Sequence, residues 1–321
     1  MRRALPITLL ILSSLAFGAC SSAASVQPSS AAPSVAPSVA ASVAASVPAS
    51  QAPSASPDAC AKDTLTLKTP GKLTIGTDNP AYPPYFQIPS GTATAPWELG
   101  DPTNGEGFES AFAYALADKL GFARTDVVWT VVPFDNSFAP GTKSFDIDVN
   151  QVSYKPERAQ AVDLSDGYYT LNQSIVALKA NALASAKTVA ELKGYKFGAQ
   201  VGTTSLDTIN NVIAPTAAAQ VYNSNDDAVA ALKAKQIDGL VVDLPTAFYV
   251  TAAQVENSAI VGQFAPPTGA DAEHFSVVLA KASPLTACVN AAIAAMKGDG
   301  SLDAITTEWL SDKASAPVIA P

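Results

Sequence analysis

The sequence has 321 residues and a formal net charge of −9, with 48 % hydrophobic and 15 % charged residues. Because nucleic acids and anionic membrane surfaces repel a negatively charged protein, this balance argues against both as partners. The length is sufficient for two lobes, each with a hydrophobic core, in addition to an N-terminal segment.

The N-terminus has the pattern of an export signal. Two arginines precede an apolar stretch at 4–15, and small residues lead to Cys20. The stretch is too short to span a membrane, which takes roughly 20 apolar residues in a helix. It resembles a bacterial lipoprotein signal, although Phe17 stands where such signals usually carry Leu. We expect 1–19 to be a lipoprotein signal peptide and Cys20 to be lipidated; the alternative is a secretory signal with Cys20 as a free thiol.

The next segment, residues 20–58, is predicted to be a disordered Ala/Ser/Pro linker. After Cys20 it contains only Ala, Ser, Val, Pro and Gln, apart from one Asp at its end. Such a composition offers no apolar face to bury. Its reach lies between roughly 35 Å as a coil and about 110 Å as polyproline II. It suits a stalk that holds a domain near a membrane, and equally a spacer that crosses a cell wall or carries glycans.

The cysteine count predicts one disulfide. The chain has three cysteines, so lipidation of Cys20 leaves Cys60 and Cys288 as a pair in an oxidising compartment. Cys288 also lies on the apolar face of a predicted helix, so a buried free thiol is the alternative.

Strands and helices alternate in the first half of the folded region. Apolar residues recur at helical spacing in residues 107–120, and residues 127–132 are a β-branched run. In chain order we expect a strand at 71–78, a helix at 107–120, a strand at 127–132, a short helix around 138–143, and strands at 145–149 and 173–178.

A second run of the same kind follows. We expect a strand at 196–200, helices from about Ser205 and at 225–233, a strand at 237–242, and helices at 284–296 and 302–310. The alternation predicts an α/β fold whose sheets are mainly parallel with helices on their faces. Two such units leave a cleft, where ligands gather at the carboxyl ends of strands.

Three polar groups near strand ends suggest a site for an amino acid zwitterion. Arg158 follows the strand at 145–149 and can hold a carboxylate through two parallel hydrogen bonds. The turn at 202–204 offers backbone N–H groups and two hydroxyls to an anion. Asp243 follows the strand at 237–242 and can bind an ammonium group. Structural roles are the alternative for each: a surface ion pair for Arg158, and helix caps for the turn and for Asp243.

An ordered set of motifs resembles the family 3 extracellular solute-binding proteins of polar amino acid ABC importers, over nearly all of residues 60–311. The motifs are Gly76-Thr77-Asp78, Tyr82-Pro83-Pro84-Tyr85, Gly107-Phe108-Glu109, Phe145-Asp146, Ser153 with Arg158, Asp163-Leu164-Ser165 with Tyr168-Tyr169, Gly202-Thr203-Thr204, and Asp238 with Asp243. The loop after Asp78 is one residue longer than in that family, and residues 88–104 look like an insertion.

The resemblance implies a two-lobed periplasmic-binding-protein type 2 fold with the ligand cleft between the two sheets. Lobe 1 would comprise 59–170 and 264–313, and lobe 2 would comprise 171–263. Residues 314–321 would be a C-terminal tail.

The resemblance also implies roles for individual residues. Arg158 would bind the ligand's α-carboxylate together with Thr203 and Thr204, and Asp243 would bind the α-ammonium. Ser153 and Gln151 would contact the backbone groups of the ligand. Tyr82 and Phe138 would sandwich the ligand, with core packing as their alternative. Asp78 could serve a cationic side chain or be structural. No cofactor and no metal ligand are expected.

The implied function is capture of an amino acid and its delivery to a membrane permease. The protein would be an extracytoplasmic monomer, anchored to the cell membrane by lipid and without enzymatic activity. One alternative is a ligand-sensing lipoprotein without a transporter. Another is an enzyme on the same fold, such as a dehydratase or a peptidoglycan-cleaving enzyme, but the single histidine, His274, stands in an ordinary strand pattern.

Overall fold

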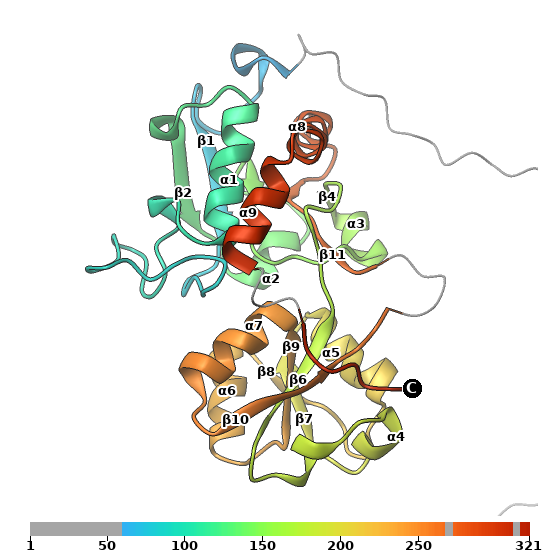
Figure 1. Cartoon of the computed structure of the whole chain (residues 1–321). Helices are drawn as coiled ribbons and strands as arrows, with labels where there is room; N and C mark the ends of the chain where they lie inside the picture. Colours follow the sequence, from blue (N-terminus) through green and yellow to red (C-terminus); the bar gives the residue numbers. More distant parts are fainter. Residues whose placement is uncertain (1–59, 267–271, 311–314) are drawn as a thin grey trace, which may run out of the picture. The chain divides into compact units, whose positions relative to one another are not determined.

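The computed structural model describes residues 60–266, 272–310 and 315–321. All of them belong to one compact unit of the chain, Gln51–Pro321. The expected signal peptide, Cys20 and the linker lie outside the described residues. Within the described part, two five-stranded sheets and a small two-stranded one organise the chain (Figure 1).

The first sheet defines what we call lobe 1. Its strand order is β2 (Val127–Val131), β1 (Leu73–Thr77), β3 (Ile147–Asp148), β12 (Val278–Ala280) and β4 (Val162–Leu164). Strand β1 pairs in parallel with β2 and β3, whereas β12 runs antiparallel to β3 and β4. The parallel strands end together beside the start of α2, where the first half of the pocket forms.

Among the described residues, the α-helices around the sheet of lobe 1 are α1 (Phe108–Lys119), α2 (Phe134–Phe138), α3 (Pro156–Ala161), α8 (Thr286–Gly298) and α9 (Ser301–Leu310). Apolar residues of α1, α8 and α9 share one core with β1 and β3, so these three helices cover the same face (Figure 1). A disulfide joins Cys60 to Cys288 of α8, as the cysteine count predicted.

The second sheet defines lobe 2. Its strand order is β10 (Ser258–Gln263), β6 (Gln173–Leu178), β9 (Gly239–Asp243), β7 (Phe197–Gln200) and β8 (Gln220–Tyr222). Strand β7 pairs in parallel with β8 and β9, and β6 runs antiparallel to β9 and β10. The two-lobed α/β class is thus confirmed, but each large sheet has as many antiparallel as parallel pairs, because chain segments arriving from the other lobe add reversed strands.

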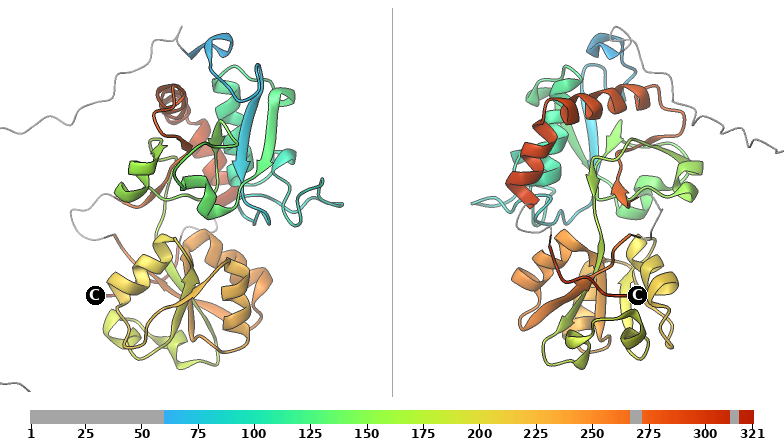
Figure 2. Two further views of the ribbon diagram at one scale, coloured as in Figure 1. Left: turned by 180° about the vertical axis from the view of Figure 1, so that it is seen from behind. Right: turned by 45° about the vertical axis from the view of Figure 1, so that its right-hand side comes forward.

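Helices cover both faces of the second sheet. They are α4 (Val189–Leu192), α5 (Thr204–Thr208), α6 (Asn225–Lys233) and α7 (Leu244–Tyr249). Two separate apolar clusters form as a result, one with α4 and the segment after α5, the other with α6 and α7. Figure 2 shows these pairs on opposite sides of the sheet.

The chain enters lobe 2 through the short segment between β5 (Tyr169–Thr170) and β6. Strand β5 pairs antiparallel with β11 (His274–Phe275), which follows lobe 2 in the sequence. The C-terminal residues do not stand apart as a tail: Val318 and Ala320 bridge to Gln263 and Thr188, beside the second sheet (Figure 2).

One expected helix is wrong in position. The short helix expected around residues 138–143 lies at Phe134–Phe138 instead. Ala139 precedes Pro140 and is extended (φ −60°, ψ 146°), as proline requires of the residue before it. The Pro140-Gly141 pair therefore ends the helix near residue 138, where we had expected the helix to begin.

Candidate ligand-binding site

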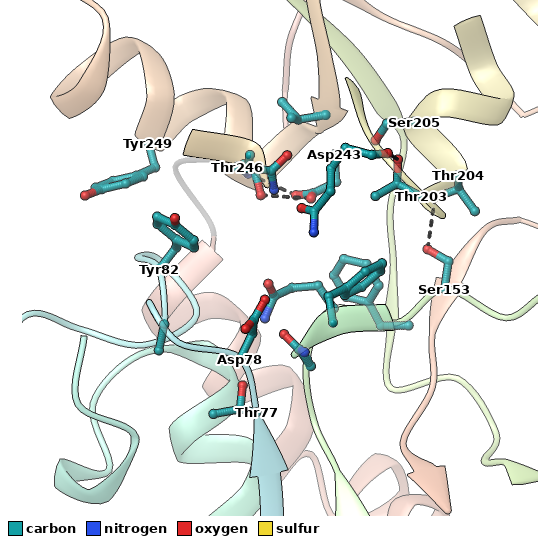
Figure 3. A pocket seen from close by; sticks show the side chains of 18 of the residues that line it. Thr77, Asp78, Tyr82, Ser153, Thr203, Thr204, Ser205, Asp243, Thr246 and Tyr249 are labelled. Carbon is teal, nitrogen blue, oxygen red and sulfur yellow. Dashed lines mark hydrogen bonds between the residues drawn. The ribbon is translucent and has the colours of Figure 1, made fainter. Parts of the chain in front are cut away.

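A pocket lies where strands of both lobes end. Thr77 is the last residue of β1, Gln200 the last of β7, and Asp243 the last of β9, and all three line it. Gln173, the first residue of β6, adds a further polar group. Figure 3 shows Asp78 and Thr77 on the side of β1, facing Asp243 and Thr246 across the pocket.

Arg158 is buried at the wall of this pocket, with only 6 % of its surface exposed. Its Nη1 donates to the Ser153 carbonyl (2.6 Å), and its Nη2 donates to the Gly202 carbonyl of lobe 2 (2.7 Å). The ring of Phe138 stacks on the guanidinium, whose carbon lies 4.2 Å from the ring centroid. Burial lowers the pKa of Arg158 to about 10, so the side chain remains a cation at neutral pH.

The alternative of a surface ion pair for Arg158 is therefore wrong. Asp163, the acidic residue five positions after Arg158, pairs instead with Lys281 at 3.4 Å and accepts a hydrogen bond from the Thr286 hydroxyl at the start of α8. A buried guanidinium retains N–H groups beyond the two that reach carbonyls, because it has five donors.

Asp243 is half-buried and combines two roles. It is the N-cap of α7: its Oδ1 accepts from the Thr246 N–H (2.9 Å) and its Oδ2 from the Thr246 hydroxyl (2.8 Å). The Tyr85 hydroxyl also donates to Oδ1. Burial raises the pKa of Asp243, and these hydrogen bonds oppose that rise. Capping and lining the pocket are thus compatible rather than exclusive.

The turn before α5 brings hydroxyls to the same end of the pocket as Ser153 (Figure 3). Gly202 has a left-handed φ of 75°, and a Cβ there would lie 2.8 Å from Asp135 Oδ1. Thr203 caps α5 by accepting from Leu206 N–H (3.1 Å). The Thr204 hydroxyl lies 3.5 Å from Ser153 Oγ, so Thr204 of lobe 2 meets lobe 1 here.

Two tyrosines define the opposite end of the pocket. The rings of Tyr82 and Tyr249 have centroids 6.4 Å apart and come from different lobes (Figure 3). Asp78 lies on the lobe 1 side, where its Oδ1 accepts from Asn79 N–H (2.8 Å). Burial raises its pKa, which its backbone hydrogen bonds partly offset.

Gln151 lines the pocket but its side chain is already engaged. Its backbone N–H donates to Glu109 Oε1 (2.8 Å), and its Nε2 donates to Glu109 Oε2. Glu109 also accepts from Tyr168 and is fully buried, which raises its pKa to about 7. These contacts hold Gln151 in a left-handed conformation (φ 49°), so its backbone path depends on a carboxyl beneath the pocket.

The pocket brings together eight of the nine expected ligand-contacting residues: Asp78, Tyr82, Gln151, Ser153, Arg158, Thr203, Thr204 and Asp243. Phe138 does not line it; Phe134, one turn earlier on α2, does. The shift follows from the earlier start of the helix, which turns Phe138 onto Arg158.

Sequence reasoning missed several lining residues. The polar ones are Thr77, Asn150, Gln173, Gln200, Ser205, Asn225, Thr246 and Gln254. Thr77 and Gln200 stand at the carboxyl ends of β1 and β7, where ligands gather in such sheets, so this rule could have found them. Gln173 stands at the amino end of β6, which lies at the same edge because β6 runs antiparallel to β9. Tyr249 and Gln254 gave no signal, because only the packing of α7 and the turn after it brings them here.

No metal or membrane element accompanies the pocket in the described part of the chain. Residues 60–266, 272–310 and 315–321 contain no group of three or more His, Cys, Asp or Glu side chains placed to hold a metal ion. Among the helices described, none is both long and apolar enough to cross a bilayer.

Two lobes with a polar pocket at the ends of their strands define a type 2 periplasmic binding protein. Comparison with known families gives the same answer. Residues 73–312 match the bacterial extracellular solute-binding proteins, family 3, and the chain belongs to this family.

Characterised relatives share the fold at moderate identity. The arginine-binding extracellular protein ArtP of Bacillus subtilis (strain 168) is 28 % identical over 221 residues, which is 67 % of this chain and 82 % of ArtP. The ABC transporter glutamine-binding protein GlnH of the same organism is 30 % identical over 227 residues, or 69 % of this chain and 79 % of GlnH.

A solved structure gives a similar match. An ancestral arginine-binding protein bound to glutamine is 29 % identical, with a TM-score of 0.59, over 74 % of this chain and 97 % of that protein. The resemblance seen in the sequence motifs is therefore confirmed at the level of family and fold.

Proposed function

We propose that this protein is the substrate-binding lipoprotein of an ABC importer and that it captures an amino acid in the pocket between its lobes. The observation that carries the proposal is the charge of the lining. Among the described lining residues, Arg158, Asp78 and Asp243 have charged side chains. One cation and one carboxylate complement an amino acid zwitterion, and a second carboxylate remains.

Arg158 binds the ligand's α-carboxylate in this proposal. Its two bonds to carbonyls fix the guanidinium in place, so little conformational entropy is lost when the remaining N–H groups meet a carboxylate. Ser153 and Thr204 supply hydroxyls at the same end of the pocket. Asp243 binds the α-ammonium.

The remaining carboxylate, Asp78, favours a ligand with a cationic side chain. A zwitterion neutralises Arg158 and Asp243 and would leave Asp78 without a counter-ion in a partly desolvated place. Tyr82 and Tyr249 stand at this end and offer aromatic faces to a cation. The relatives support both options, since ArtP is named for arginine and GlnH for glutamine.

The test is a thermal-shift screen against the common L-amino acids, followed by calorimetry of the wild type and of Asp78→Asn with L-arginine and L-glutamine. A ligand that binds the folded state raises its melting temperature. Asp78→Asn should lower the affinity for L-arginine about tenfold or more, because it removes the counter-ion without changing the shape of the side chain. It should change the affinity for L-glutamine by less than about threefold. Equal changes for both ligands contradict the cationic preference, and a screen without any stabilising amino acid contradicts the function itself.

The lipid anchor and the permease are part of the same proposal. The family is extracellular, and the signal pattern before Cys20 supports attachment to the outer side of the cell membrane. Because residues of a single chain form the pocket, a monomer is sufficient. Cys20→Ala should move the protein from the membrane fraction to the soluble extracytoplasmic fraction while ligand affinity stays the same. Retention of the variant in the membrane would exclude the anchor.

Delivery to a permease separates an importer from a sensory lipoprotein. Deletion of the gene should reduce uptake of the radiolabelled ligand, and normal uptake would favour the sensory role. Recovery of the bound ligand unchanged after long incubation would distinguish binding from turnover.

A further inference from the structure

Tyr85 stands behind the pocket wall and is fully buried. It belongs to lobe 1, where it follows Pro83-Pro84 in the loop after β1 and joins the apolar core of that lobe. Its hydroxyl donates to Oδ1 of Asp243, at the end of β9 in lobe 2. A residue of one lobe thus binds the carboxylate that we assign to the ligand's ammonium in the other.

The position of Tyr85 is fixed from three sides. Its backbone carbonyl accepts from Glu109 N–H at the start of α1 (2.9 Å), and its ring meets Phe275 edge-on with centroids 6.0 Å apart. Gly107 permits the close approach of the loop, because a Cβ there would lie 2.5 Å from the Tyr85 carbonyl oxygen. The hydroxyl can therefore reach Asp243 without ordering a free side chain.

Asp243 is then oriented from both lobes. Thr246 donates to Oδ1 through its N–H (2.9 Å) and to Oδ2 through its hydroxyl (2.8 Å). The Tyr85 hydroxyl donates a second hydrogen bond to Oδ1. Because a carboxylate offers about four acceptor positions, these three donors leave one on Oδ2 for a group in the pocket.

The surroundings of Asp243 make the Tyr85 hydroxyl important for its charge. Titratable groups that interact electrostatically with Asp243 include Glu273, Glu109, Tyr168 and Tyr169, all of which are anionic or neutral. Burial raises the pKa of Asp243. Among the hydrogen bonds that lower this pKa, the bond from Tyr85 has the largest effect. Loss of that hydroxyl should raise the pKa of Asp243 further.

We propose that Tyr85 is a positioning residue for the ammonium subsite: it aims the Asp243 carboxylate from the opposite lobe, so that the subsite is complete only when the two lobes meet. The inference rests on the proposed function, because it assigns Asp243 to an ammonium group. It adds a residue outside the pocket lining, in the loop that follows β1.

Calorimetry of Tyr85→Phe tests this role with L-arginine and L-glutamine, each compared with the same compound lacking its α-amino group. At neutral pH the variant should bind whichever of the two amino acids has the higher affinity about tenfold more weakly than the wild type does. Its affinity for the deaminated analogue should stay the same, because only the amino acid has an ammonium group that contacts Asp243. Binding of the amino acid should fail as the pH falls and Asp243 is protonated. In Tyr85→Phe the midpoint of that loss should move to higher pH.

Tyr114→Phe is the matched control, because the Tyr114 hydroxyl donates to the Thr103 carbonyl within lobe 1 (3.0 Å). It should keep the wild-type affinity and pH profile. In the pair Tyr85→Phe and Asp243→Asn, the losses should be far from additive, since the first acts through the second. The melting temperature of each unliganded variant reports whether it folds.

Three results overturn the inference. One is wild-type affinity and pH profile in Tyr85→Phe. Another is an equal loss for the amino acid and its deaminated analogue, which indicates a general structural role. The third is additivity in the double variant. A wild type that binds neither amino acid nor any other in the screen overturns the proposed function, and the inference with it, so the two failures are distinguishable.

Discussion

At the scale of single residues, hydrogen bonds within the protein hold two of the charged groups of the pocket in place. Arg158 donates to carbonyls from both lobes and stacks on Phe138. Asp243 accepts from Thr246 and Tyr85. Such groups lose little freedom on binding, which is the physical basis of a preorganised site.

Arg158→Ala should abolish capture of the amino acid. Truncating a buried, hydrogen-bonded charge weakens binding by about 100-fold or more, since the ligand's carboxylate is left without its partner. Calorimetry measures the loss. Lys155→Ala is the control: Lys155 is a nearby cation that pairs with Asp207 and does not line the pocket, and its removal should leave affinity within about threefold. Wild-type affinity in Arg158→Ala would contradict the assignment of Arg158 to the ligand's α-carboxylate.

At the scale of elements, the pocket arises where β-strands pass into helices. Strand β7 leads to α5 through the cap Thr203, and β9 leads to α7 through the cap Asp243. The last residues of the chain, beyond the family match at residue 312, add a further element. Ile319 N–H donates to the Gln263 carbonyl (2.9 Å), and its side chain enters the core that β6, β7 and β9 share.

Ile319→Ala should therefore destabilise lobe 2. Ile319 is 4 % exposed and packs where Gly262 lacks a side chain, so its truncation leaves a cavity. The expected loss is about 2–5 kcal/mol in the free energy of unfolding. The neighbouring Val318 is 59 % exposed, and Val318→Ala should change stability by less than about 0.5 kcal/mol. Denaturant unfolding of both variants measures the difference; equal stability would show that the C-terminal segment is not part of the core.

At the scale of the whole molecule, each lobe has its own hydrophobic clusters, and the pocket between the sheets is mainly polar. Separate cores let two bodies move as units about short crossings, whereas a shared core would resist this. The disulfide acts within lobe 1, where it ties the start of the described chain to α8.

Replacing both Cys60 and Cys288 by Ser should lower the free energy of unfolding by about 2–4 kcal/mol. The bond spans 228 residues of sequence, so its loss frees a large part of the unfolded chain. Ligand affinity should stay the same, because neither cysteine lines the pocket. Thermal melting with and without reductant, alongside calorimetry, checks both statements; a large loss of affinity would show that the disulfide also shapes the site.

Much of this protein was determined by local sequence alone. The predicted bounds of α1, β6 and α6 lie within a residue or two of the observed ones. For α1 the reason is an apolar pattern that repeats at helical spacing over enough residues to select one structure. Counting cysteines predicted the disulfide. Arg158 and Asp243 were predicted as pocket residues because they follow strand ends, and parallel strands bring their ends to one edge of a sheet. Both residues line the pocket.

Other features were decided only by the tertiary structure. Phe138 stacks on Arg158 rather than lining the pocket, because α2 starts earlier than its sequence suggested. Tyr85 meets Asp243 across 158 residues of sequence, and the C-terminal segment pairs with lobe 2. None of these contacts leaves a local pattern, because each joins residues that are distant in the sequence and become neighbours only when the chain has folded.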